Sequence, residues 1–119
     1  MNIENILITT AEPKSIFLEI LFKYFKSKKF NKNKKKIILI GNLSLISKQA
    51  IKFNFKKKFN LISDIKEAKK KIINIINIKL ENPDEVFSKD FSKYISNSFD
   101  RSLAILKKHT KTVLINGPI

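Results

Sequence analysis

Few side chains in this 119-residue sequence could do chemistry on their own. The chain has no Cys, which excludes disulfides and leaves a zinc-ribbon site unsupported. Its single histidine, His109, follows a lysine-rich helix end, where a solvated imidazole is expected more than a catalytic base. Local sequence assembles no Ser/His/Asp or Cys/His set for nucleophilic catalysis, and we expect no metal site built from this chain alone.

Polar groups suited to ligand binding instead follow two predicted strands. Thr9, Thr10 and Glu12 come after the first apolar run, and Asn116 and Gly117 come after the last. In open parallel sheets, ligands gather outside the carboxyl ends of the strands, so these two segments form the candidate site. Their chemistry would be hydrogen bonding and charge, since neither the Gly-x-Gly-x-x-Gly pattern nor a Walker Gly-x-x-x-x-Gly-Lys pattern is present.

Two interpretations of Glu12 remain open. Pro13 suits the first position of a helix, and the apolar residues from Ile16 to Phe25 recur at helical spacing, which predicts a helix that begins at Pro13. A carboxylate beside that helix start would stabilise its positive end. Glu12 is therefore either a structural cap or a ligand contact.

Strands and helices alternate along the predicted fold. Apolar, β-favouring runs predict strands at residues 5–9, 37–41, 59–62, 72–78 and 112–115; helical patterns cover 13–25, 42–53, a brief turn after Asp64, and a long segment capped by Ser88. The run 72–78 is ambiguous, because its Asn residues recur every three positions and fit neither period. The apolar face predicted for the last helix is Phe91, Tyr94, Ile95, Phe99, Leu103 and Leu106. This order predicts one α/β region over 1–119, with a parallel or mostly parallel sheet and helices on both faces.

The formal charge of +15 raises the alternative of a small nucleic-acid-binding module. Of the 25 basic residues only Arg101 is an arginine, whereas base and phosphate recognition favours the guanidinium fork. We therefore interpret the charge as a background spread over solvated faces, and the run 26–36 as a helix end plus a loop. A basic surface formed by 26–36 and 56–58, or a phosphate-binding patch in the first run, stays the alternative. No apolar run could span a bilayer and no secretory signal is visible, so we expect a cytoplasmic protein.

The two candidate segments resemble motifs of one enzyme family. Residues 8–20 resemble the opening motif of 4-hydroxythreonine-4-phosphate dehydrogenase, which reads approximately T-x-G-[DE]-P-A-G-I-G-P-E; Glu12, Pro13, Ile16 and Glu19 match it, while Phe17 stands where the motif has a glycine. Residues 113–119 resemble the later (L/V)-(I/V)-T-G-P-(I/V) strand and turn of that family. The predicted elements between the motifs also come in the order of the family's N-terminal portion.

The resemblance implies the fold of the isocitrate and isopropylmalate dehydrogenases, which bind NAD without the Rossmann pattern. It also implies oxidation of 4-phosphohydroxythreonine in pyridoxal phosphate (vitamin B6) biosynthesis, with NAD or NADP, a divalent metal (Zn, Mg or Co) and a homodimer. Glu12, Pro13 and Ile16 would then lie at the cofactor, and Asn116 and Gly117 at the substrate cleft. The family's metal-binding histidines come after its Gly-Pro turn. We therefore expect the N-terminal portion of a longer enzyme, inactive by itself, with a non-catalytic remnant as the alternative.

Overall fold

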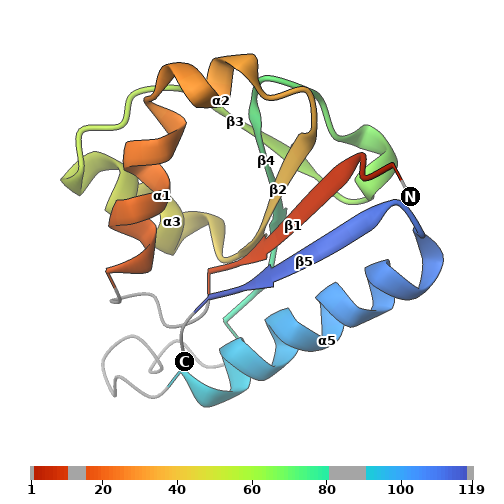
Figure 1. Ribbon diagram of the computed structural model, residues 1–119. Coiled ribbons are helices and arrows are strands. Elements are labelled where there is room, and N and C mark those ends of the chain that lie inside the picture. The colour runs from red at the N-terminus through yellow and green to blue at the C-terminus, as the bar shows by residue number, and fades with distance from the viewer. Residues whose placement is uncertain (1, 11–15, 81–90, 118–119) are drawn as a thin grey trace.

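The computed structural model describes residues 2–10, 16–80 and 91–117, whose arrangement Figure 1 shows. The strands are β1 (Asn5–Thr9), β2 (Lys36–Gly41), β3 (Phe59–Ile62), β4 (Ile73–Asn77) and β5 (Thr112–Asn116). The helices are α1 (Phe17–Phe25), α2 (Lys28–Lys32), α3 (Leu43–Lys52), the 3-10 turn η1 (Ile65–Glu67) and α5 (Ser92–Lys108). Each predicted strand is confirmed to within one residue at its ends.

The five strands form one sheet that is parallel throughout, in the order β3-β4-β2-β1-β5. β1 lies between β2 and β5, and the register places Thr9 opposite both Ile40 of β2 and Asn116 of β5. The carboxyl ends of the first and last strands are therefore neighbours. This arrangement confirms the predicted α/β class.

Helices cover both faces of the sheet, as predicted (Figure 1). α1, α2 and α3 pack on one face around a cluster that includes Phe22 and Leu39. α5 and η1 pack on the other, around a cluster that includes Ile38 and Ile105. A strand buried from both sides needs apolar residues at successive positions, which explains the uninterrupted apolar run of β2.

The predicted apolar face of α5 is partly wrong. Phe99 is 39% exposed and Leu103 is 38% exposed, whereas Ser98 and Ser102 are buried. The two serine hydroxyls donate to the carbonyl oxygens of Tyr94 and Ser98, at 2.9 and 2.8 Å, so neither is left unsatisfied inside. Small side chains at these positions let the helix lie close to the sheet. The buried residues of this segment are Phe91, Tyr94, Ser98, Ser102 and Ile105.

Helix boundaries also differ from the prediction. The lysine-rich run 26–36 contains α2, where we expected a helix end followed by a loop. The Ser27 hydroxyl accepts the N–H of Phe30 at 3.4 Å and so caps α2, and the buried Phe30 ring packs against Phe25. A single aromatic residue thus anchors a helix among lysines. The predicted helix start at Pro13 and the predicted cap at Ser88 lie outside the described residues.

Asn74 explains the ambiguous pattern of the run 72–78. Its side chain is fully buried, and Nδ2 donates to the carbonyl oxygens of Ile37 and Lys69, both at 2.9 Å. Its Oδ1 accepts from Asn60 Nδ2 at 2.8 Å and from the N–H of Lys69 at 2.9 Å. One amide therefore joins β2, β3 and the turn before β4. Asn77 is polar for another reason, since its Oδ1 accepts a backbone N–H from the first turn of α3 at 2.8 Å.

Replacing Asn74 should destabilise the whole sheet. Asn74→Ala leaves the buried carbonyl oxygen of Ile37 and the partly buried N–H and carbonyl oxygen of Lys69 without these partners, and we expect it to lower the free energy of unfolding by about 3 kcal/mol. Urea unfolding followed by circular dichroism measures this change. Asn31→Ala is the matched control, because Asn31 is exposed on α2 and its loss should cost no more than about 0.5 kcal/mol. Equal effects of the two substitutions would contradict the role of Asn74.

Candidate functional site

Hydrogen bonds join the carboxyl ends of β1 and β5. The hydroxyl of Thr9 donates to Oδ1 of Asn116, and the N–H of Gly117 lies 3.1 Å from both Oγ1 and the carbonyl oxygen of Thr9. Thr9 is only 2% exposed, so its bond with Gly117 is shielded from competing water, and its bond with Asn116 is partly shielded. Asn116 is exposed, and its amide nitrogen has no hydrogen-bond partner within the described ranges. We call this set, Thr9, Asn116 and Gly117, the strand-tip junction.

Gly117 is required by close packing at the strand-tip junction. A Cβ atom at this position would come within 2.7 Å of the carbonyl oxygen of Thr9 and 2.8 Å of the Phe17 ring. Only glycine admits so close an approach without a shift of its neighbours. Phe17 stands where the motif that residues 8–20 resemble has a glycine, and its ring packs closely against Gly117.

The hydroxyl of Tyr94 forms a second junction at the same edge of the sheet. Its oxygen accepts the N–H of Asn42 at 2.7 Å and lies 3.3 Å from Oγ1 of Thr10. A Cβ atom on Gly41 would come within 2.8 Å of that oxygen. The Tyr94 hydroxyl can therefore lie this close to the end of β2 only because residue 41 is a glycine. Burial raises the pKa of Tyr94, which keeps the phenol neutral. Tyr94 was predicted as an apolar contact, and the sequence signals its polar role only through Gly41.

Some of the predicted site residues lie together in the structure, and others lie apart or outside the described residues. Asn116 and Gly117 lie side by side with Thr9, as the parallel order requires. Ile16 immediately precedes α1 and is 67% exposed, so it is accessible from solvent. Glu12 and Pro13 lie outside the described residues, and their predicted contact with a cofactor stays a prediction.

The described residues offer no fit for a metal ion. Within residues 2–10, 16–80 and 91–117, no group of three or more His, Cys, Asp or Glu side chains could hold one. The strand-tip junction supplies hydroxyl, amide and backbone groups, which bind and orient a ligand by hydrogen bonds. Among the same described residues, no helix is long and apolar enough to cross a bilayer.

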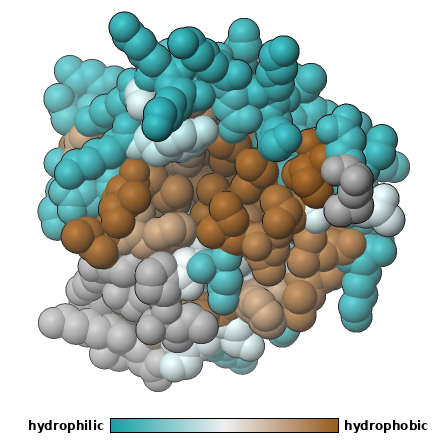
Figure 2. Space-filling model, in the orientation of Figure 1, coloured by the Kyte–Doolittle hydropathy of each residue, from teal (hydrophilic) through white to brown (hydrophobic). Residues whose placement is uncertain are grey.

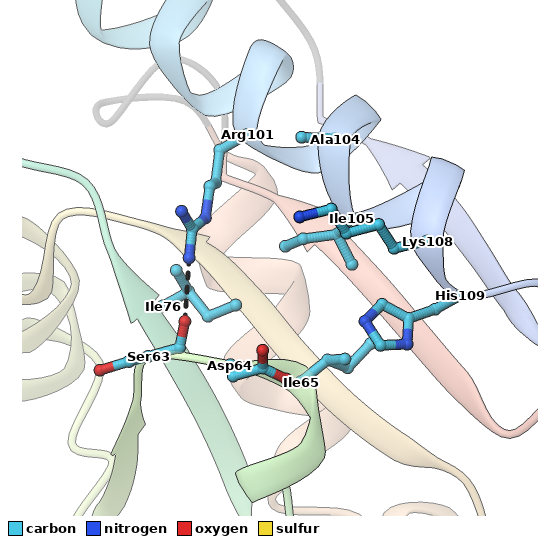
Figure 3. A pocket seen from close by; sticks show the side chains of 9 residues that line it. All are labelled: Ser63, Asp64, Ile65, Ile76, Arg101, Ala104, Ile105, Lys108 and His109. Carbon is cyan, nitrogen blue, oxygen red and sulfur yellow. Dashed lines mark hydrogen bonds between the residues drawn. The ribbon is translucent and has the colours of Figure 1, made fainter.

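His109 lines a different hollow, of about 100 Å³, between α5 and η1 (Figure 3). Nη2 of Arg101 donates to the carbonyl oxygen of Ser63 at 2.9 Å and so ties α5 to the turn after β3. Lys108 and Asp64 also line the hollow, which gives its walls both signs of charge. The imidazole is half-buried, where the sequence predicted a solvated one.

The two lysine runs lie at the opposite end of the sheet from the strand-tip junction. They precede β2 and β3, so they adjoin the amino ends of the strands. Nζ of Lys26 donates to the carbonyl oxygen of Phe53 at 2.6 Å, and Nζ of Lys57 donates to that of Phe25 at 3.3 Å. These two lysines tie neighbouring segments together. The hydrophilic surface at the top of Figure 2 is too far from the strand tips to contact a ligand there. Its charges would act on such a ligand only through long-range electrostatic attraction.

The fold and the paired strand tips define an open parallel α/β domain whose candidate site lies at the carboxyl edge of the sheet. By sequence, no family model and no curated protein matches the chain. Solved structures of 4-hydroxythreonine-4-phosphate dehydrogenases do match it. The structure from Burkholderia phymatum aligns with a TM-score of 0.71 at 17% identity, over 99% of this chain and 37% of its own.

Two further structures of the same enzyme agree with this match. The Klebsiella pneumoniae structure aligns with a TM-score of 0.70 at 15% identity, and a Salmonella typhimurium protein assigned to that enzyme aligns with 0.73 at 18%. Each alignment covers 97% of this chain and 37% of the other. The chain therefore has the fold of part of these dehydrogenases and spans little more than a third of their length. This confirms, for the fold, the resemblance that the two motifs indicated.

Removing the Tyr94 hydroxyl should weaken the second junction. Tyr94→Phe leaves the buried N–H of Asn42 without its acceptor, and we expect a loss of about 1–2 kcal/mol in the free energy of unfolding. Tyr24→Phe is the control, because the Tyr24 hydroxyl accepts only a long hydrogen bond from Asn33, at 3.5 Å. This substitution should lower the free energy of unfolding by less than about 0.5 kcal/mol. Urea unfolding compares the two variants. Equal losses of unfolding free energy would contradict a stabilising role for the Tyr94 hydroxyl.

The stabilisation from the Tyr94 phenol should also depend on pH. Its pKa in the folded chain is raised above the ordinary value of 10.0, so the unfolded chain ionises first as pH rises. The contribution is fully present below about pH 10 and is lost as pH rises through the folded pKa. The difference in unfolding free energy between the natural chain and Tyr94→Phe should therefore be constant near neutral pH and narrow above about pH 10. A difference that widens there would contradict this sign.

Proposed function

We propose that this chain supplies one wall of the active-site cleft of an NAD-dependent, metal-dependent dehydrogenase that oxidises 4-phosphohydroxythreonine in pyridoxal phosphate biosynthesis. One observation carries the proposal: the strand-tip junction brings together the only two segments whose residues resemble motifs of that enzyme. The names of the structural neighbours support the same reaction. The complete enzyme would be a cytoplasmic homodimer with NAD or NADP as its cofactor.

The residues of this chain would bind and orient the ligands. The Thr9 hydroxyl donates to Oδ1 of Asn116 and so orients the amide group. The exposed amide nitrogen of Asn116 would then donate to a substrate oxygen. Glu12, Pro13 and Ile16 would lie beside the cofactor. When bound, the nicotinamide accepts the hydride from the secondary alcohol. No group of the described residues fits a metal, and the metal-binding histidines that the family resemblance implies would come after the Gly-Pro turn.

The nucleic-acid-binding alternative has less support. Lys26 and Lys57, one from each lysine run, donate to backbone carbonyl oxygens within the chain, so part of the basic surface has a structural use. The remaining lysines would still attract polyanions in a salt-dependent way. A remnant that keeps the fold without binding ligands is the third possibility, and the same experiment distinguishes all three.

Ligand titration by NMR tests the proposal. With millimolar NAD and 4-phosphohydroxythreonine added to the isotope-labelled chain, we expect backbone amide shifts at Thr9, Asn116 and Gly117, because these groups would line the cleft wall. A short single-stranded RNA is the control ligand, and it should shift lysine-run amides and lose its effect as salt rises.

Three patterns of shifts separate the possibilities. Specific shifts at the strand tips that persist at high salt support the dehydrogenase. Shifts confined to residues 26–36 and 56–58 with all three ligands support a basic binding module. A folded chain whose strand-tip amides respond to neither dehydrogenase ligand contradicts the proposal and favours the remnant.

A further inference from the structure

The chain's two rarest cationic residue types meet at one place, the hollow of about 100 Å³ between α5 and η1 (Figure 3). Arg101 is the one arginine among 25 lysines and arginines, and His109 is the one histidine. Both line this hollow, together with Lys108. The excess of lysine that runs through the sequence does not account for this grouping. We call the space that these three residues line the charged hollow.

Helical spacing brings the cations to one side of α5. Arg101 and Lys108 stand seven positions apart, which is close to two full turns, so both project from the same face of the helix. Ala104 lies about one turn along from Arg101, and its small side chain leaves space between the two long ones. Figure 3 shows the Lys108 side chain extending toward Arg101, and the His109 ring pointing toward η1. The three cationic groups therefore face a common space.

Arg101 is fixed in place by the chain itself. Its Nη2 donates to the carbonyl oxygen of Ser63 at 2.9 Å, which is the one hydrogen bond that its guanidinium makes within residues 2–10, 16–80 and 91–117. The Lys108 ammonium and the His109 ring form no hydrogen bond or ion pair with any part of the chain that the structure describes. Even a neutral imidazole has one N–H to donate. Donors on three side chains are therefore available to a ligand.

Asp64 is the one carboxylate among the described residues that line the charged hollow. Its Oδ1 accepts the N–H of Lys66 at 2.8 Å as the cap of η1, so this oxygen already has a partner. That hydrogen bond lowers the pKa of Asp64, with smaller contributions from the charges of His109 and Arg101. At neutral pH the positive charges of Arg101 and Lys108 outnumber this single carboxylate, so the hollow has a net positive charge.

Apolar side chains surround these charges. Ile65 and Ile105 line the charged hollow, and apolar walls strengthen an electrostatic contact because they screen it less than water does. A second hollow, of about 300 Å³, shares Ile76 and Arg101 with the first and continues along the carboxyl ends of β3 and β4. In the strand order, β2 separates β4 from β1 and β5, so both hollows are distinct from the strand-tip junction.

We propose that the charged hollow binds a phosphate group through Arg101, Lys108 and His109. A phosphate has enough oxygens to accept from all three side chains at once, and the planar guanidinium matches it with paired hydrogen bonds. The volume of about 100 Å³ is several times the roughly 10–15 Å³ that a single water molecule needs, so such an ion has room. Inorganic phosphate would occupy the charged hollow alone, and an organic phosphate would also place its body in the second hollow. This inference goes beyond the proposed dehydrogenase function and does not rest on it.

Phosphate titration followed by NMR tests the proposal. With sodium phosphate replacing sodium chloride at constant ionic strength, we expect saturable shifts of the His109 ring and of the backbone amides of Ser63, Asp64 and Ile65, which border the hollow. Phenyl phosphate is the second probe. If it binds at least about threefold more tightly than inorganic phosphate, the ligand is an organic phosphate whose body lies in the second hollow. Equal affinities assign the site to free phosphate.

Three substitutions in the lining test the named groups. Arg101→Gln should raise the dissociation constant of phosphate at least about tenfold, because it removes both the charge and the guanidinium fork. Lys108→Gln should raise it about threefold, and it breaks no hydrogen bond or ion pair among the described residues. Asp64→Asn should lower it about twofold, because it removes the opposing charge and keeps an oxygen to cap η1. Circular dichroism confirms that each variant is folded.

Lys107→Gln is the matched control for the general attraction of a basic chain. Lys107 is exposed on α5 beside Lys108 but does not line the hollow, so its loss removes the same charge and should change the dissociation constant by less than about 1.5-fold. The absence of saturable shifts in the natural chain would overturn the proposal. Equal effects of Lys107→Gln and Lys108→Gln, or weaker binding by Asp64→Asn, would also overturn it. If Arg101→Gln does not fold, these two comparisons decide the question.

Discussion

The parallel pairing of β1 with β5 is the constraint on which the rest of the structure depends. It brings the first and last strands together at their carboxyl ends and places the Thr9 hydroxyl between Asn116 and the N–H of Gly117. Thr9 is only 2% exposed, so its bond with the Gly117 N–H is buried, while its bond with the exposed Asn116 is partly shielded from water. Among the described residues, the same pairing makes β5 an edge strand of the sheet, with β1 as its one neighbour.

The strands and the fold class could be predicted from sequence because they depend on local pattern. A strand covered on both faces needs consecutive apolar residues, and β2 and β5 each show such a run. Alternation of these runs with helical stripes then predicted the parallel sheet. The strand-tip residues Asn116 and Gly117 followed from the same order, since carboxyl ends of parallel strands share an edge.

Other features depend on contacts between distant residues, which local pattern does not report. Ser98 and Ser102 face the sheet because small side chains fit there, so hydrophobicity alone identified only part of the buried face of α5. Asn74 looked irregular because its amide serves three segments at once. The hydroxyl of Tyr94 accepts a hydrogen bond from Asn42, which lies 52 positions away in the sequence. The one local sign of this contact is Gly41, whose missing side chain leaves room for the hydroxyl.

The coupling between Thr9 and Asn116 tests the central claim most directly. A double-mutant cycle with Thr9→Val and Asn116→Ala, followed by urea unfolding, isolates the interaction that joins the two strand tips. The account predicts a stabilising coupling free energy of about 1 kcal/mol, because the bond is partly shielded from water and links the ends of β1 and β5. Effects that add to within about 0.3 kcal/mol would mean that the two tips are not joined through these side chains, and would contradict a shared site.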